Sequence, residues 1–420
     1  MNSQKWALLL KINLGVFVVF MLQGCTYSEK KDKEHLVFKY NEHSNIATLD
    51  PAFARNPQTI WPTNQLFNGL VQLDDQLNIQ PDIAKSWRIN DSTSTYTFTL
   101  RDDVYFHKNK VFKKDSTRRV IAQDFVYSFD RLLSPGLASP GSWVFSAVQR
   151  YHAANDSTLV IQLKKPFPAF LGLLSMRYCS VVPKEAIAYY GNDFRSNPVG
   201  TGPFVFKFWE ENVKLVLRKN PIYFEKDTQG NRLPYLEAVA ITFLPDKQSE
   251  FLQFAQGNID FMTGLDNSYK DEIITTKGAL QPKYKDRVKL ITTPYLNTEY
   301  LGFFMGSTSK EIASPFIRQA INYGFDREKM VTYLRNGMGI AATHGFIPKG
   351  LAGFDSIQGY SYNPEKARAL INAYKQATGA TTIQVTIGTN SQYLDLCEYI
   401  QRELELSLIH ISEPTRHRSI

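Results

Sequence analysis

The alternation of apolar and polar positions along the chain predicts a mixture of strands and helices. The run Thr95–Leu100 (TYTFTL) alternates polar and apolar residues, which is typical of a half-buried strand. Within Asp124–Leu133 (DFVYSFDRLL) the apolar residues recur at helical spacing and gather on one face. Asp124 suits the N-terminal end of that helix. The presence of both patterns indicates the α/β class.

Further elements follow from turn and capping signals. Glu210–Asn212 separates two apolar runs, Phe204–Trp209 and Lys214–Arg218, and predicts a hairpin. Asn363 before Pro364 and Glu365 predicts the start of a helix that Gly379 ends. The other expected strands are Leu36–Tyr40, Thr158–Leu163, Ala238–Leu244 and Thr381–Gly388, and the other expected helices are Lys247–Gln256, Pro315–Phe325 and Ser391–Glu405.

The N-terminus carries the pattern of an export signal. Lys5 and Lys11 accompany Ile12–Leu22, an uncharged and mostly apolar run of eleven residues. A membrane-spanning helix needs about twenty, so this run has the length of a signal-peptide core. Leu22–Cys25 (LQGC) resembles the lipobox of bacterial lipoproteins. We therefore expect a signal peptide over 1–24, lipidation of Cys25 and a polar tether over 25–35; an uncleaved signal anchor is the alternative.

Composition narrows the class of protein. The 420 residues suit two or three domains, and 43% hydrophobic residues can form a large core. The net charge of +8 is spread along the chain, without a basic run among aromatic residues, so nucleic-acid binding is not predicted. The three cysteines, Cys25, Cys179 and Cys397, match neither a disulfide framework nor a metal site.

Motifs for catalysis are absent from the sequence. It contains no HExxH, no GxSxG and no phosphate loop ending in GK[ST]. Gly200–Pro203 is glycine-rich, but it precedes a strand rather than a helix. His107, His344 and His410 are far apart and are interpreted as structural or surface residues. We therefore predict no catalytic residue, no metal site and no cofactor, and a protein that is not an enzyme.

Eight stretches, taken in order, carry a family resemblance. They are Leu49–Ala52 (LDPA), Leu66–Val71 (LFNGLV), Pro81–Trp87 (PDIAKSW), Tyr96–Arg101 (YTFTLR), Ala122–Ser128 (AQDFVYS), Asn197–Phe204 (NPVGTGPF), Arg218–Phe224 (RKNPIYF) and Arg318–Arg327 (RQAINYGFDR). In order and spacing over Leu36–Glu405 they resemble the extracytoplasmic binding proteins of oligopeptide and dipeptide ABC importers, solute-binding family 5. Phe106–Lys110 departs from the acidic-glycine turn usual in the family. Trp87, Phe98 and Tyr223 are expected in the core.

The resemblance implies a two-lobed periplasmic-binding-protein fold, type II-like with an extra inserted domain. Lobe 1 is expected to use 36–67 and 198–300, with the inserted domain at 68–197. Lobe 2 is expected at 301–405, with the crossing near Thr298–Phe304. The lobes of such proteins close on ligand by a hinge, and an extended peptide is held by main-chain hydrogen bonds.

The resemblance also implies partners and ligand-facing residues. The expected partners are a peptide, an ABC permease with its ATPase, and a bacterial membrane through the lipid anchor; nucleic acid is not expected, and the protein is expected to be a monomer. For each ligand-facing position, surface or core packing is the alternative. The positions are Phe53, Arg55 and Asn56 after the Asp50-Pro51 motif, Trp143 in the inserted domain, and Thr263, Asn267, Tyr300 and Phe303 beside the lobe crossing.

The last residues differ in character from the body. Leu406–Arg416 (LSLIHISEPTR) resembles the translation of a transposon adapter used for sequencing libraries. We expect 406–420 to be non-native and the second lobe to be incomplete; a genuine C-terminal tail is the alternative.

Other functions stay open from the sequence alone. The same fold accommodates other solutes, such as a nickel chelate, an oligosaccharide or a cell-wall peptide. A surface lipoprotein that senses a partner protein and an extracytoplasmic hydrolase are the alternatives from other classes.

Overall fold

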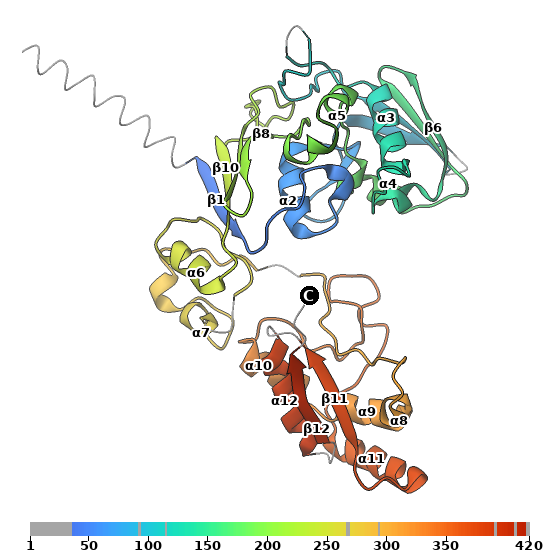
Figure 1. Ribbon diagram of the computed structural model, residues 1–420, viewed down its shortest axis with the longest axis vertical. Helices are drawn as coiled ribbons and strands as arrows, with labels where there is room; N and C mark the ends of the chain where they lie inside the picture. The colour runs from blue at the N-terminus through green and yellow to red at the C-terminus, as the bar shows by residue number, and fades with distance from the viewer. Residues whose placement is uncertain are drawn as a thin grey trace, which may run out of the picture. The chain divides into compact units, whose positions relative to one another are not determined.

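The chain forms two compact units in the computed structural model (Figure 1). The structure describes residues 36–90, 94–113, 116–265, 269–292, 295–389, 393–406 and 410–416, the last range as backbone alone. Unit 1 extends to Thr263 and unit 2 begins at Gly264. The predicted lobe crossing at Thr298–Phe304 lies inside unit 2, and the assignment of segments to lobes stays a prediction. Cys25 and Asn267 lie outside the described residues.

The first sheet of unit 1 has the strand order β1-β10-β9-β8. β1 is parallel to β10, and the other neighbours are antiparallel. The predicted hairpin is confirmed as β8 and β9, and the strands predicted at Leu36 and Ala238 are confirmed as β1 and β10. The strands are β1 (Val37–Glu42), β8 (Phe204–Glu210), β9 (Lys214–Lys219) and β10 (Ala238–Phe243).

The second sheet of unit 1 is antiparallel, with the order β4-β5-β7-β6. The predicted strands β5 and β7 have the predicted bounds, and every second residue of each is buried. Phe98 is among these buried residues, whereas Trp87 is half-buried. The strands are β4 (Ala84–Ile89), β5 (Thr95–Leu100), β6 (Val148–Asn155) and β7 (Thr158–Leu163). Figure 1 shows β6 and β1 on opposite sides of unit 1, with α2 between them.

Helix α3 (Ala122–Leu133) packs on β6 and β7 with the apolar face that its sequence predicts. Phe125, Phe129 and Leu132 on that face are buried. The helix begins two residues before Asp124, so Asp124 lies in its first turn, where its Oδ2 accepts a hydrogen bond from the Ile121 N–H at 3.0 Å. The carboxylate therefore satisfies a free backbone N–H group at the helix N-terminus.

The remaining elements of unit 1 are short. They are η1 (Pro51–Phe53), α2 (Pro57–Leu66), β2 (Val71–Leu73), β3 (Ile79–Pro81), η2 (Ser142–Phe145), α4 (Phe170–Leu174), η3 (Arg177–Cys179), α5 (Lys184–Tyr190), η4 (Gly191–Ser196) and α6 (Lys247–Ala255). Strands of the first sheet come only from 36–67 and 198–300, and those of the second only from 68–197.

The glycine-rich stretch Gly200–Pro203 is a packing feature. A Cβ atom on Gly200 would lie 2.0 Å from the carbonyl oxygen of Leu66, and one on Gly202 would lie 2.5 Å from the carbonyl carbon of Leu66. The buried imidazole of His107 is hydrogen-bonded to this stretch. Its Nδ1 accepts from the Gly200 N–H at 3.2 Å, and its Nε2 donates to the Gly202 carbonyl at 3.0 Å. The interpretation of His107 as a structural residue is confirmed.

Unit 2 is built around the helices α9, α11 and α12 and a two-stranded sheet. β11 pairs with β12 in parallel, α11 packs on α9, and α12 packs on the sheet. Asn363 caps α11 and Gly379 ends it in the left-handed region at φ 74°, as predicted. The elements are α7 (Lys270–Ile273), η5 (Pro282–Tyr284), α8 (Lys310–Ala313), α9 (Pro315–Tyr323), α10 (Arg327–Leu334), α11 (Pro364–Thr378), β11 (Gln384–Thr389), α12 (Leu394–Glu405) and β12 (His410–Arg416).

The segment predicted to be non-native contributes β12. Its backbone pairs with β11 from His410 to Arg416. The origin of 406–420 stays a prediction.

Candidate functional site

The loop Asp50–Asn56, here called the Asp50 loop, is anchored at its first residue. Oδ1 of Asp50 accepts a hydrogen bond from the Ala52 N–H at 3.0 Å and one from Nη1 of Arg131 on α3, also at 3.0 Å. Only 6% of the Asp50 side chain and 12% of the Arg131 side chain are exposed. A charge pair this well shielded keeps much of its Coulomb attraction. The start of the loop is therefore held firmly against α3.

The far end of the Asp50 loop is fixed by a capping box. Oδ1 of Asn56 accepts from the Thr59 N–H at 3.1 Å and from the Thr59 hydroxyl at 2.8 Å. This satisfies one of the free N–H groups at the start of α2. Asn56 was predicted to face ligand, and it is exposed. Its carbonyl oxygen is already used in the cap, so its amide NH₂ is the group that can reach a ligand.

The turn Ser139–Trp143 lies against the Asp50 loop. The Ser139 hydroxyl donates to the Ala52 carbonyl at 2.6 Å and accepts from the Gly141 N–H at 3.0 Å. A Cβ atom on Gly141 would lie 2.3 Å from the ring of Tyr178, so this approach requires glycine. Trp143 ends the turn with 51% of its surface exposed. An indole this exposed is available for contact with another molecule.

Tyr178 of η3, whose ring lies against Gly141, also feels the charge of Arg55 on the Asp50 loop. Burial raises the pKa of the Tyr178 hydroxyl, and the positive charge of Arg55 opposes that shift. Arg55 itself is exposed, whereas Phe53 is half-buried and packs against the core of unit 1. The predicted residues Arg55, Asn56 and Trp143 are thus exposed on two segments that the Ser139–Ala52 hydrogen bond joins. Together they are here called the Asp50-loop surface, which supplies a cation, an amide and an indole.

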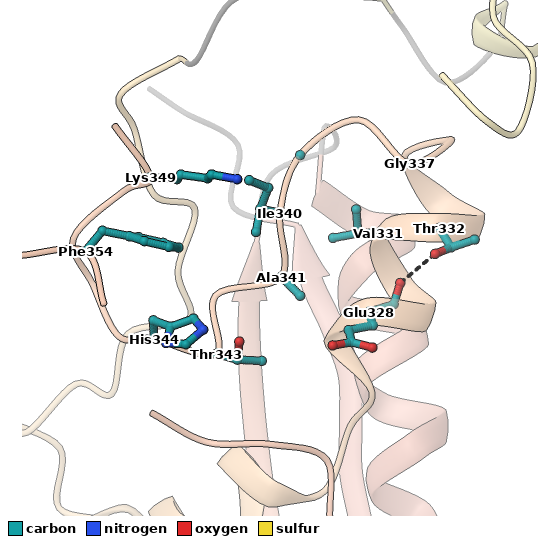
Figure 2. Close-up of a pocket in the computed structure, with 11 residues that line it drawn as sticks. Glu328, Val331, Thr332, Gly337, Ile340, Ala341, Thr343, His344, Lys349 and Phe354 are labelled. Carbon is teal, nitrogen blue, oxygen red and sulfur yellow. Dashed lines mark hydrogen bonds between the residues drawn. The ribbon is translucent and has the colours of Figure 1, made fainter. Parts of the chain in front are cut away.

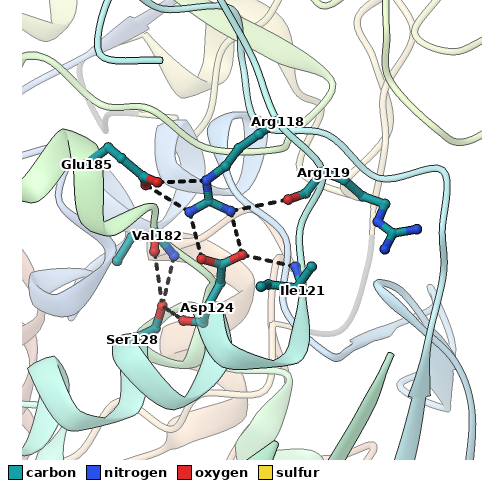
Figure 3. Close-up of polar contacts among 7 residues, drawn as sticks. All are labelled: Arg118, Arg119, Ile121, Asp124, Ser128, Val182 and Glu185. Carbon is teal, nitrogen blue, oxygen red and sulfur yellow. Dashed lines mark hydrogen bonds and ion pairs between the residues drawn. The ribbon is translucent and has the colours of Figure 1, made fainter. Parts of the chain in front are cut away.

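A half-buried ion-pair network connects α3 to a neighbouring helix (Figure 3). Nη2 of Arg118 lies 2.7 Å from Oδ1 of Asp124 and 2.8 Å from Oε2 of Glu185. Burial raises the pKa of Glu185, but the hydrogen bonds and charge of Arg118 outweigh it, so the net shift is downward. The Ser128 hydroxyl accepts from the Val182 N–H at 2.9 Å. This network ties α3, which carries Arg131, to α5.

The other predicted site residues are dispersed. Thr263 is exposed at the last position of unit 1. In unit 2, the exposed ring of Tyr300 lies 5.1 Å from that of Phe346, centroid to centroid. Phe303 is half-buried against the core of unit 2 and lines an apolar cavity of about 450 Å³ beside β11. The ligand contacts of these residues stay predictions.

Sequence reasoning missed Arg131, Ser139 and Tyr178. Arg131 is 81 positions from Asp50, and Ser139 is 87 positions from Ala52. No local pattern marks either pair. The requirement for glycine at position 141 also becomes visible only when Tyr178 is placed beside it.

Two other kinds of site have no support among the described residues. None of the helices there is both long and apolar enough to cross a membrane. No group of three or more His, Cys, Asp or Glu side chains within the same ranges is arranged to hold a metal ion. Cys179 and Cys397 are buried free thiols in different units, and burial raises the pKa of Cys179 to about 12.

Comparisons with known proteins agree with this architecture. The glutathione-binding protein GsiB of Salmonella typhimurium is 26% identical over 361 residues, which are 86% of this chain and 66% of that protein. The chain therefore spans just under two thirds of the length of such relatives. The names of these relatives describe binding proteins.

Solved structures resemble the chain over most of its length. The periplasmic binding protein DppA of Helicobacter pylori, in complex with the peptide STSA, has a TM-score of 0.72 and 25% identity, covering 90% of this chain and 74% of that one. NikZ of Campylobacter jejuni, in complex with Ni(L-His), has a TM-score of 0.67 and 21% identity, with the same coverage. The predicted α/β fold of the two-lobed periplasmic binding proteins is confirmed.

A family model extends the agreement to the sequence as a whole. The model described as bacterial extracellular solute-binding proteins, family 5 middle, matches residues 78–411. This match covers more than half of the chain and includes residues of both units. The chain belongs to family 5 of the bacterial extracellular solute-binding proteins.

Proposed function

We propose that the protein captures peptides between two lobes and delivers them to the permease of an ABC importer. The observation that carries the proposal is the Asp50-loop surface, where Arg55, Asn56 and Trp143 are exposed on a rigidly anchored loop and turn. A guanidinium and an amide suit the carboxylate and carbonyl groups of a peptide main chain. An indole suits apolar side chains of varied shape.

The names of similar proteins support a peptide ligand. One similar structure was solved with the peptide STSA, and a similar curated protein is named for glutathione, itself a small peptide. Main-chain hydrogen bonds would make recognition tolerant of side-chain identity. Peptide capture is therefore favoured over other solutes.

The proposal includes a lipid anchor at Cys25. The pattern LQGC after an apolar run supports it. Several acyl chains would hold the protein stably at a membrane. Expression of Cys25→Ser beside the unchanged chain tests this part: the unchanged chain should sediment with membranes and the variant should not. Sedimentation of both to the same extent would contradict lipidation at Cys25.

Calorimetric titration of the purified protein tests the binding part. The probes are the peptide STSA, reduced glutathione and Ni(L-His). STSA should bind, and Arg55→Ala and Trp143→Ala should each weaken it by about tenfold or more, because exposed Arg and Trp side chains dominate contact surfaces. Arg88→Ala and Tyr189→Ala, on exposed side chains of β4 and α5, are the matched controls.

The titration distinguishes the class of ligand and the place where it binds. Tight binding of Ni(L-His) with no binding of STSA would replace the peptide by a metal chelate as the ligand. Binding of STSA that is equal in all four variants would remove the Asp50-loop surface from the proposal.

A further inference from the structure

A second cavity lies wholly within unit 2, between α10 and the loop that follows it (Figure 2). Its volume is about 430 Å³. Ligand pockets for small molecules generally begin at about 300 Å³. The cavity shares no residue with the Asp50-loop surface, and all of its lining residues lie between Glu328 and Phe354.

One wall of this cavity is the face of α10 that carries Glu328, Val331 and Thr332. These positions are three and four residues apart, so they share a side of the helix. The Thr332 hydroxyl is used within the helix, where it donates to the Glu328 carbonyl at 2.9 Å. The Glu328 carboxylate forms no ion pair within the described ranges, and its side chain is exposed. This wall therefore presents an unpaired negative charge beside an apolar side chain.

The facing wall presents the opposite charge. Figure 2 shows Lys349, His344 and Phe354 across the cavity from α10. The rings of His344 and Phe354 pack 5.3 Å apart, centroid to centroid. Neither Lys349 nor His344 has an ion-pair partner in the part of the chain that the structure describes. An ammonium group and an imidazole N–H group are therefore available as donors to an anion.

The loop that follows α10 contributes glycine residues to the lining of the cavity. Gly337 and Gly339 line it with φ values of 70° and 111°. Glycine adopts such angles without strain, and it adds no side chain to the space. Ile340 and Ala341 complete an apolar surface between the charged walls (Figure 2).

We propose that this cavity binds a small zwitterion, such as a free amino acid or a dipeptide. The ammonium group of the ligand pairs with Glu328, and its carboxylate pairs with Lys349 and His344. The apolar part of the ligand packs on Val331, Ile340 and Phe354. Opposite charges on facing walls select a molecule that carries both charges at once, because a ligand with one charge leaves the other wall unpaired. The cavity shares no residue with the Asp50-loop surface, and this proposal does not depend on the proposed function.

The test uses the full chain with Arg55→Ala and Trp143→Ala already in place, so that binding at the Asp50-loop surface is weakened beforehand. Glycyl-L-leucine is titrated by calorimetry, together with its N-acetyl and C-amide derivatives. The dipeptide should bind. Each derivative should bind about tenfold more weakly or worse, since hydrogen bonds to charged groups contribute strongly to affinity.

Substitutions localise the binding. Glu328→Gln and Lys349→Gln should each weaken the dipeptide about tenfold, by the same reasoning. Glu398→Gln on α12 and Lys310→Gln on α8, both exposed, are the matched controls and should leave its affinity unchanged. Circular dichroism confirms that all variants are folded.

The proposal is overturned by any of three results. These are no dipeptide binding at millimolar concentration, binding of either derivative as tight as that of the dipeptide, or dipeptide binding by Glu328→Gln or Lys349→Gln as tight as that by the parent protein. Failure of the peptide proposal is seen separately, in the response of STSA binding to the Arg55 and Trp143 substitutions without changes in unit 2.

Discussion

Unit 1 and unit 2 differ in how completely they bury their apolar side chains. The largest fully buried side chains of the described residues, among them Phe98, Phe129 and Phe194, all lie in unit 1. In unit 2, by contrast, Tyr295, Tyr300 and Phe304 are 79%, 72% and 76% exposed. Apolar surface that stays exposed to this extent is typical of regions that contact another molecule or segment.

The two units also differ in their polar interactions. The Asp50–Arg131 pair of unit 1 is largely shielded from water, with 6% and 12% of the two side chains exposed. The Arg335–Asp395 pair of unit 2 is more open, with 21% and 32% of the two side chains exposed. Unit 1 therefore holds the Asp50 loop firmly by its own shielded contacts, while the polar contacts of unit 2 are more open to water.

The largest expected effect is in the core of unit 1. Phe98→Ala should lower the free energy of unfolding by about 3–5 kcal/mol, because it leaves a cavity among packed rings. Phe304→Ala should change it by about 0.5 kcal/mol or less. Urea unfolding followed by tryptophan fluorescence measures the effect of Phe98→Ala, since all five tryptophans precede unit 2, and urea unfolding followed by circular dichroism measures that of Phe304→Ala. Similar losses in both variants would remove the contrast between the units.

The next effect concerns the ion pairs. Arg131→Met should lower the free energy of unfolding by about 3 kcal/mol, because the Asp50 carboxylate is left buried and unpaired. Arg335→Met should cost about 1 kcal/mol, because water already screens the more open pair. Thermal and urea unfolding followed by circular dichroism compare the two. A cost for Arg335→Met as large as that for Arg131→Met would contradict the assignment of the rigid site to unit 1.

A pH-dependent effect is expected from Glu42 at the end of β1. Burial and then repulsion from Glu250 raise its pKa to about 7, with Lys247 opposing. A folded-state value above the ordinary 4.5 means that its contribution to stability is complete below pH 4.5 and is lost as the pH rises through about 7. Glu42→Gln removes this ionisation. The stability of the variant relative to that of the unchanged protein should therefore increase as the pH rises from 5 to 8.

Melting temperatures at several pH values test this prediction. Neighbouring groups also titrate: burial raises the pKa of Glu250, and burial and then Lys247 lower that of His43. Both remain in the Glu42 variant, so the difference between the two curves reports Glu42. Glu210→Gln, on an exposed side chain, is the control. Parallel curves for Glu42→Gln and the unchanged protein would mean that the Glu42 carboxyl is not shielded in the folded state.

The smallest expected effect is at a helix cap of unit 2. Oδ1 of Asn363 accepts from the Lys366 N–H at 2.9 Å, so Asn363→Ala should cost about 1 kcal/mol. Circular dichroism should register the loss, whereas the transition seen by tryptophan fluorescence should stay in place. A shift of the fluorescence transition would mean that the two units unfold together. Asn56→Ala, which removes the corresponding cap of α2 in unit 1, should shift both the circular-dichroism transition and the fluorescence transition.

Much of the fold follows from local sequence patterns. The alternation in β5 and β7, the hairpin of β8 and β9, and the caps of α11 all depend on residues close together in the chain. The apolar pattern fails for α2, which contains Pro62 and lacks a clear apolar face. Its stability comes instead from the Asn56 cap and from packing against the distant residues Gly200 and Gly202.

The candidate site is less predictable because its contacts are long-range. The motif around Asp50 and the exposed Trp143 were identified from the sequence through the family resemblance. The roles of Arg131, Ser139 and Tyr178 depend on tertiary approach and leave no mark in local composition. The unit 2 cavity is likewise formed by loop residues, such as Gly339 and Lys349, that belong to no periodic pattern.

The most direct test of the central claim is hydrogen exchange measured by mass spectrometry with and without the peptide STSA. The account predicts slower exchange on peptide binding in the segments that contain the Asp50 loop and the turn Ser139–Trp143. Slower exchange confined to other segments, with both of these unchanged under saturating peptide, would contradict the claim that unit 1 presents the peptide-binding surface.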